Sequence, residues 1–288
     1  DAGIDDALAI FCAFKYCNVK AISCTYGNCE QQKVFQNVKR IVSVYKQQHP
    51  DFQPPIICLS SSCSLSKVQP VRPPNDELNY HGLDGLGNVP IVDECVLDIV
   101  PQDFILTYTT LIAEFPAMAF ISIGPLTAAS ILSSLNLPIN LFLMGCCFDI
   151  LEPYAKGNMG RFGFPNAEHN LVCDVEAARE LFKKQNTLVV DWNLCLQNLL
   201  NKNEYENLHF QSGKVGLFHR NVSQWFLKRC NEDNIDFCCC DSLIVFCNCF
   251  CEFEYLNGEI EIQEDGKTVF NESPNGNCQI VTKIDKQK

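Results

Sequence analysis

Short apolar runs alternate with longer amphipathic stretches along most of the chain. Buried strands are predicted at the apolar runs 19–25, 54–59, 118–123, 139–144 and 186–192. Helical spacing predicts helices at 5–15, 30–48, 104–114, 127–135, 175–184 and 193–201. This alternation is typical of an α/β fold with an open, mostly parallel, Rossmann-like sheet and flanking helices.

Polar, glycine-bearing segments follow the predicted strands. They are "TYGN" (25–28), "SIGPLT" (122–127) and "MGCCFD" (144–149), and "DAGIDD" (1–6) would hold the same place after a preceding strand. Open parallel sheets bind ligands at the carboxyl ends of their strands, so we expect these segments to meet there. "PNAEHN" (165–170) and "CCCDS" (238–242) are the next candidates.

The pattern predicts one domain over residues 1–288, without internal repeats. The stretch 68–90 is rich in proline and glycine and too polar for a core, so it predicts a long loop. Loops of that length in a compact domain are usually functional or disordered. The tail at 271–288 is predicted to be partly loose.

Charge excludes two classes of partner. The formal net charge is −12 and the pI is about 4.8, which argues against a nucleic acid and against an anionic membrane surface. We also find no uninterrupted apolar stretch long enough to span a bilayer.

The chain has 19 cysteines, most of them inside apolar runs. This pattern favours buried, reduced thiols in a reducing compartment, and therefore a cytoplasmic protein. The clusters "CCC" and "CNCFC" lack the paired spacing of a zinc site. A cysteine-rich metal or redox protein remains the third alternative.

Three aspartates, Asp1, Asp5 and Asp6, stand at the start of "DAGIDDALAI". Asp5 and Asp6 precede an apolar helix, and one interpretation is that they cap its N-terminus. That interpretation does not account for Asp1 and Gly3, which bring a third carboxylate to the same loop. Carboxylates without a nearby lysine or arginine persist when a cation compensates them, and an all-oxygen set selects Ca²⁺ or Mg²⁺ over zinc.

These segments together resemble the inosine–uridine-preferring nucleoside hydrolases. The similarity runs in order through "DAGIDDALAI", "YGN" (26–28), "HGLDGLG" (81–87), "IGPLT" (123–127), "LMG" (143–145), "KGN" (156–158) and "PNAEHNLVCDVEAA" (165–178). Family members have a strand and an earlier aspartate before the first motif. The resemblance therefore implies that the first strand is missing and that the chain is N-terminally truncated.

The resemblance implies a metal site and a catalytic base. The carboxylates of Asp1, Asp6 and Asp241, with the backbone oxygen of Ile123, would hold one Ca²⁺. The metal would lower the pKa of a water molecule, and Asp1 would take its proton.

Six further residues would contact the ribose by the same resemblance: Asp5, Asn28, Met144, Asn158, Glu168 and Asn170. Without the resemblance, Asn28 and Asn158 would be turn residues because each follows a glycine. Glu168 and Asn170 could instead cap a helix that starts near Asp174.

The chain departs from the family at the residue that protonates the leaving base. Family members that hydrolyse purine nucleosides and uridine have histidine before the last aspartate, whereas this chain has Cys240, as a subgroup of the family does. A thiol is a weak donor, and His81 is the other candidate acid. His169 also replaces the usual phenylalanine, and about ten residues after Asp241 are absent relative to the family.

The implied activity is Ca²⁺-dependent hydrolysis of the N-glycosidic bond of ribonucleosides to ribose and free base, within nucleoside salvage. The implied partner is a small ribonucleoside, and the resemblance implies a homo-oligomer, a dimer or a tetramer. The alternative is a pseudoenzyme of the same fold that binds a nucleoside or ribose and has lost turnover.

Overall fold

The structure is a computed structural model. It describes residues 1–67, 79–90, 96–150, 156–210, 213–250 and 252–285. Residues 68–78 of the predicted loop at 68–90 lie outside these residues, and its part from 79 to 90 contains turns without a helix or strand.

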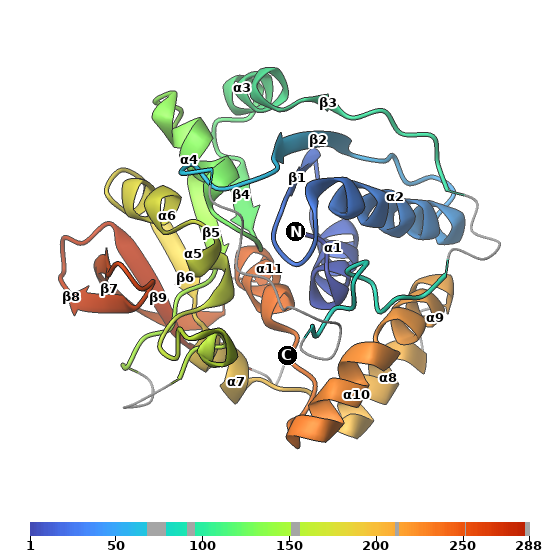
Figure 1. Ribbon diagram of the computed structural model, residues 1–288. Coiled ribbons are helices and arrows are strands. Elements are labelled where there is room, and N and C mark those ends of the chain that lie inside the picture. The colour runs from blue at the N-terminus through green and yellow to red at the C-terminus, as the bar shows by residue number, and fades with distance from the viewer. Residues whose placement is uncertain (68–78, 91–95, 151–155, 211–212, 251, 286–288) are drawn as a thin grey trace.

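The strands form two sheets (Figure 1). The smaller is parallel and has the order β1 (Ala21–Thr25), β2 (Ile56–Ser61), β3 (Gln102–Asp103). The larger has the order β4 (Ala119–Ser122), β5 (Asn140–Met144), β6 (Thr187–Val190), β9 (Cys278–Ile284), β7 (Phe253–Ile262), β8 (Thr268–Glu272). Its first four strands are parallel, and β7 runs antiparallel to both of its neighbours. The prediction of an α/β fold with a mostly parallel sheet is confirmed.

Helices flank these sheets. Those of the N-terminal half are α1 (Ile4–Tyr16), α2 (Gln31–Gln48), α3 (Phe104–Glu114) and α4 (Thr127–Ser134). Those of the C-terminal half are α5 (His169–Cys173), α6 (Val175–Phe182), α7 (Trp192–Gln197), α8 (Lys202–Phe210), α9 (Gly213–Val222), α10 (Gln224–Asp233) and α11 (Cys240–Phe250). Figure 1 shows α8, α9 and α10 together on the side of the molecule away from β7 and β8.

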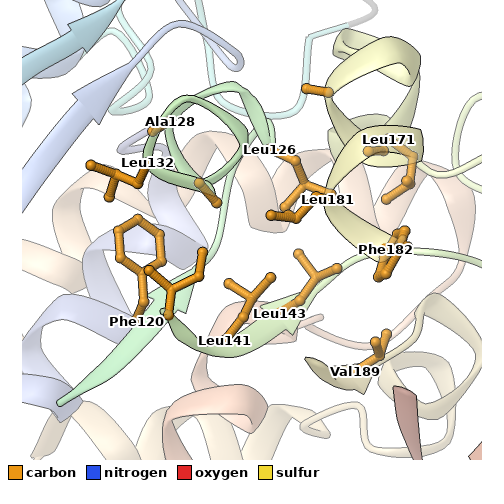
Figure 2. Packing of buried hydrophobic residues seen from close by; sticks show 14 of the residues in the cluster. Phe120, Leu126, Ala128, Leu132, Leu141, Leu143, Leu171, Leu181, Phe182 and Val189 are labelled. Atoms are coloured by element: carbon orange, nitrogen blue, oxygen red, sulfur yellow. The ribbon is translucent and has the colours of Figure 1, made fainter. Parts of the chain in front are cut away.

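The alternation of side chains along β5 decides which helices cover each face of the larger sheet. Leu141 and Leu143 point to one face, where they pack with α4 and α6 (Figure 2). Met144 belongs to the cluster on the opposite face, with Ile4 of α1 and Ile244 of α11. Burial of both faces explains why the parallel strands read as continuous apolar runs.

A large cavity of about 850 Å³ lies between the facing edges of β1 and β4. Each of these strands is paired on one side only. Helices α1, α2 and α11 also contribute to the wall, and Ser23 Oγ in β1 is buried there without a hydrogen-bond partner. The missing first strand stays a prediction.

The C-terminal tail at 271–288, predicted to be partly loose, is mostly strand over 271–284. Residues 271–284 contain the end of β8 and all of β9, and β9 lies between β6 and β7 in the larger sheet. Cys278, Ile280 and Val281 are buried there, but polar neighbours interrupt the apolar run that would reveal a strand. Residues 286–288 lie outside the described residues.

The helix predictions also differ from the structure in the C-terminal half, where α5, α8, α9, α10 and α11 were not predicted. The helix predicted at 193–201 ends at Gln197, and the chain then forms α8. The helix Cys240–Phe250 was not predicted, because its run of cysteines and aromatic residues shows no helical period. Among the described residues, we find no helix long and apolar enough to cross a bilayer.

Candidate active site

Three carboxylates from opposite ends of the chain meet at one point. Asp5 and Asp6 lie in the first turn of α1, and Asp241 lies in the first turn of α11. The two helices pack against each other (Figure 1), and one carboxylate oxygen from each aspartate lies within 4.8 Å of the other two. The two helices therefore bring together acidic groups that are far apart in sequence.

Asp6 has a structural role as well. Its Oδ2 accepts hydrogen bonds from the backbone N–H of Gly3 at 2.7 Å and from Asn28 Nδ2 at 3.0 Å. The first bond satisfies a free donor at the start of α1, so the capping interpretation holds for Asp6. The second connects α1 to the loop after β1.

Asp1 lies beside this cluster, between two loops. Its Oδ2 accepts a hydrogen bond from the Asn28 backbone at 2.8 Å, whereas its Oδ1 is buried without a partner. A Cβ at Gly27 would lie 1.9 Å from Asp1 Oδ2, and one at Gly124 would lie 2.5 Å from Asp1 Oδ1. Only glycine allows the loops after β1 and β4 to approach the carboxylate this closely.

Two carboxylates of the cluster have raised pKa values, although the Asp1 α-ammonium lies 3.4 Å from Asp6 Oδ1. Burial, followed by the charges of Asp5 and Asp6, raises the pKa of Asp241 well above its ordinary value. Burial also raises the pKa of Asp5, although His81 opposes this. No lysine or arginine occurs among the described residues that line the adjacent cavity.

That adjacent cavity has a volume of about 340 Å³, and we call it the substrate pocket. It gathers most of the residues that the sequence singled out: Asp5, Asn28, His81, Ile123, Met144, Asn158, Glu168, Asn170, Cys240 and Asp241. Asp1 and Asp6 line the larger cavity instead, and Ile123, directly after β4, lines both.

Glu168 caps α5 and also faces the substrate pocket. Its carboxylate accepts hydrogen bonds from the backbones of Asn170 and Leu171 at 2.9 and 3.3 Å. Complete burial raises its pKa to about 7, although these bonds oppose the shift. The capping alternative is therefore right for Glu168, but the capped helix begins at His169, and Asp174 caps the next helix.

The two asparagines of the pocket are held by hydrogen bonds. Asn158 Oδ1 accepts from the His169 backbone at 2.9 Å, and Asn170 Nδ2 donates to the Met144 carbonyl oxygen at 3.2 Å. The segment at 156–158, the end of β5 and the start of α5 thus form one polar wall. Both side chains are fixed before any ligand arrives.

His81 is oriented by the start of α1. Its Nδ1 accepts a hydrogen bond from the Ile4 backbone at 3.2 Å and lies 3.6 Å from Asp5 Oδ1. A neutral imidazole that accepts at Nδ1 carries its proton on Nε2. His81 is therefore set up as a donor through Nε2.

Cys240 lies in a group of buried thiols. Its Sγ is 2.9 Å from Cys238 Sγ. A hydrogen bond with the Cys195 thiol, together with burial, raises the Cys240 pKa well above its ordinary value. Cys240 therefore remains a protonated thiol at neutral pH.

The sequence did not reveal the apolar wall of the substrate pocket. Its members are Tyr80, Phe162, Trp192, Phe226 and Ile235. The ring centroid of Phe226 lies 5.5 Å from that of Tyr80 and 5.9 Å from that of His81. Of these five residues, the sequence could have indicated only Tyr80, which directly precedes His81. The other four residues lie in segments without a recognisable motif.

Helix α10 also holds the loop that carries His81. Trp225 Nε1 donates a hydrogen bond of 2.7 Å to the carbonyl oxygen of Asn79, two residues before His81. A Cβ at Gly87 would lie 2.2 Å from the Val222 carbonyl oxygen, so the other end of this loop packs closely on α9.

Sequence comparison finds relatives among nucleoside hydrolases. The non-specific ribonucleoside hydrolase RihC of Salmonella paratyphi A is 28% identical over 192 residues, which cover 64% of this chain and 56% of that protein. RihC of Klebsiella pneumoniae is 27% identical over 186 residues, covering 63% and 55%. The chain thus spans little more than half the length of these curated relatives.

Solved structures show the same fold over nearly the whole chain. The plant nucleoside hydrolase PpNRh1 superposes with a TM-score of 0.84 at 23% identity, covering 100% of this chain and 93% of that one. A purine-preferring ribonucleoside hydrolase from Gardnerella vaginalis gives a TM-score of 0.82 at 21% identity, covering 99% and 92%. The family profile of the inosine-uridine preferring nucleoside hydrolases matches residues 1–288. This chain belongs to the inosine-uridine preferring nucleoside hydrolase family.

Proposed function

We propose that this site hydrolyses the N-glycosidic bond of ribonucleosides and releases ribose and the free base. The observation that carries the proposal is the convergence of Asp5, Asp6 and Asp241, of which Asp5 and Asp241 line a pocket of about 340 Å³. The pocket has a polar wall of amides and carboxylates and an apolar, aromatic wall. Such a pocket suits a ligand with one hydroxyl-rich half and one flat, aromatic half.

The donor set fits a divalent cation. The three carboxylates offer oxygen ligands only, burial raises the pKa values of Asp5 and Asp241, and the Asp1 Oδ1 atom beside them is buried without a partner. We propose Ca²⁺, held by Asp1, Asp6, Asp241 and the carbonyl oxygen of Ile123, with Asp5 close by. When bound, the cation would lower the pKa of a water molecule and neutralise the clustered carboxylates.

The remaining groups are proposed to act as the general base and to bind the ribose. Asp1 is proposed as the general base, because its free Oδ1 can accept a proton. Asp5, Asn28, Asn158, Glu168 and Asn170 are proposed to hold the ribose hydroxyls, and Met144 to line the sugar site. Rigid binding of the sugar orients its anomeric carbon for attack, and the negative floor favours the positive charge that grows on it.

The departing base needs a proton, and two residues could donate one. His81 carries its proton on Nε2 in the tautomer that the Ile4 hydrogen bond selects. Cys240 remains a thiol, which is a weaker donor. We propose His81 as the main acid, with Tyr80, Trp192 and Phe226 stacking on the base. We also propose that the protein is a cytoplasmic homo-oligomer that takes part in nucleoside salvage.

The test is release of ribose by the full chain from inosine, uridine and p-nitrophenyl riboside, each with Ca²⁺ and with excess chelator. We expect Ca²⁺-dependent release from all three substrates, lost in Asp241→Asn. His81→Ala should reduce the inosine rate about 10²–10⁴-fold and leave the nitrophenyl rate nearly unchanged, because nitrophenolate departs without an acid.

Two results would contradict the proposal. Equal losses on inosine and the nitrophenyl substrate would show that His81 is not the acid. Binding of ribose and Ca²⁺ without release from any substrate would identify the chain as a pseudoenzyme.

A further inference from the structure

Two cysteines that the proposed function does not use lie side by side at the far end of the helix pair. Cys17 directly follows α1, and Cys249 lies in the last turn of α11. Their sulfur atoms are 3.1 Å apart, although 232 residues separate them in the sequence. Both side chains are half-buried, and both residues are free cysteines.

These cysteines face each other because α1 and α11 pack against each other. At their N-terminal ends the two helices present Asp5, Asp6 and Asp241, whose oxygens lie within 4.8 Å. At their C-terminal ends, the rings of Tyr16 and Phe250 pack edge to face at 5.3 Å. The same helix pair therefore has the acidic cluster at one end and the thiol pair at the other.

Small molecules can reach this thiol pair. Cys17 and Cys249 are each partly exposed. The pair Cys238 and Cys240 is closer, at 2.9 Å, but both residues are buried. The Cys17–Cys249 pair is therefore the more accessible of the two.

We propose that Cys17 and Cys249 form a reversible disulfide that ties the end of α1 to the end of α11. A disulfide bond is about 2.05 Å long, so the sulfurs need to approach by only about 1 Å. The oxidant is a low-molecular-weight disulfide such as oxidised glutathione. The Cys249 thiolate attacks it and releases one thiol. Burial raises the pKa of the Cys17 thiol to about 12, so Cys17 gives its proton to solvent as its sulfur displaces the second thiol from Cys249.

The disulfide would close a loop over most of the chain. Cross-links over long loops restrict the unfolded chain strongly and stabilise the folded protein. A protein of this size gains about 2 °C in melting temperature per kcal/mol, so we expect a rise of roughly 5 °C on oxidation. The proposal is independent of the proposed hydrolase activity, because neither cysteine lines the substrate pocket.

The experiment compares the full chain with Cys17→Ser, Cys249→Ser and the matched control Cys63→Ser. Each protein is equilibrated with reduced and oxidised glutathione at graded ratios, alkylated, digested and mapped by mass spectrometry. Melting temperatures are measured in parallel. We expect a Cys17–Cys249 linked peptide and the melting shift in the wild type and in the control. Both should be absent from the other two variants.

Two outcomes would overturn the proposal. In one, Cys17 and Cys249 stay fully alkylated at every glutathione ratio. In the other, either cysteine is linked to a different partner, such as Cys12 or Cys251, which lies outside the described residues. A variant that fails to fold is replaced by the alanine variant at the same position. The peptide map of the wild type shows by itself whether Cys17 and Cys249 are linked.

Discussion

Glu168 shows how burial sets the chemistry of a single side chain. It is almost completely buried and accepts two backbone hydrogen bonds at the start of α5. Burial raises its pKa from 4.5 to about 7, so it changes charge near neutral pH. A neutral carboxyl can donate a hydrogen bond to a ribose hydroxyl, and a carboxylate can only accept one.

The raised pKa predicts how stability depends on pH. The folded state binds the proton of the Glu168 carboxyl more tightly than the unfolded chain does. Its contribution to the free energy of unfolding is therefore fully present below about pH 4.5 and is lost as the pH rises through about 7. The difference in pKa corresponds to about 3 kcal/mol. Urea unfolding of the metal-free chain should show this loss between pH 5 and 8.

Glu168→Gln is the matched variant, because the amide keeps the shape and does not titrate. Its free energy of unfolding should fall less between pH 5 and 8 than that of the wild type. Parallel pH profiles for the two proteins would show that Glu168 is ionised throughout, contrary to the raised pKa.

At the scale of elements, the aspartates that cap helices differ in how many other segments they hydrogen-bond. Asp103 caps α3 through one hydrogen bond, to the Leu106 backbone at 2.7 Å, and is exposed. Asp174 caps α6 and is buried. It also accepts from the Leu65 backbone at 2.9 Å and from Thr127 Oγ1 at 2.6 Å. One carboxylate thus connects α6, the segment after β2 and the start of α4.

We therefore expect unequal effects from the same substitution. Asp103→Ala should cost about 1 kcal/mol of stability, as loss of an exposed cap does. Asp174→Ala should cost about 3 kcal/mol, because it removes the acceptor of two buried donors, the Ala177 N–H and the Thr127 hydroxyl, and of the partly buried Leu65 N–H. Equilibrium urea unfolding of the two variants measures this difference. Equal losses would mean that the contacts of Asp174 with Leu65 and Thr127 contribute nothing.

For the whole molecule, the acidic cluster joins the two ends of the chain. Asp5 and Asp6 come from α1 and Asp241 from α11, so folding forces together charges that the unfolded chain keeps apart. A cation that binds the folded state alone should stabilise it by about 2.7 kcal/mol at one hundred times its Kd. We expect the melting temperature of the full chain to rise by several degrees on addition of Ca²⁺.

Two substitutions make this expectation specific. Asp241→Asn and Asp6→Asn should each abolish the gain with Ca²⁺, and the exposed control Asp51→Asn should keep it. Asp241→Asn should also stabilise the metal-free chain at pH 8, because a neutral amide avoids both the burial of a charge and the repulsion by Asp5 and Asp6, which together raise the Asp241 pKa. If Ca²⁺ left the melting temperature unchanged in protein first shown to be metal-free, this result would contradict the proposed metal site.

The sequence by itself determined the parallel core and most of the polar residues of the site. Strands buried on both faces leave continuous apolar runs, and glycine-bearing loops follow them, so β1, β2, β4, β5 and β6 could be located without a structure. The acidic loop at 1–6 could be singled out because its chemistry is local, whereas the roles of Glu168, Asn170 and Asp241 came from the family resemblance.

Only the tertiary structure decided which of these residues meet. The insertion of β9 between β6 and β7 depends on partners distant in sequence, and its polar neighbours hide it from any local pattern. The gathering of Asp5 and Asp6 with Asp241 depends on the packing of α1 on α11. The aromatic wall of Tyr80, Trp192 and Phe226 depends on how α7 and α10 pack beside the His81 loop. Local periodicity specifies the faces of an element, whereas the partners of those faces are chosen when the whole chain buries its apolar surface.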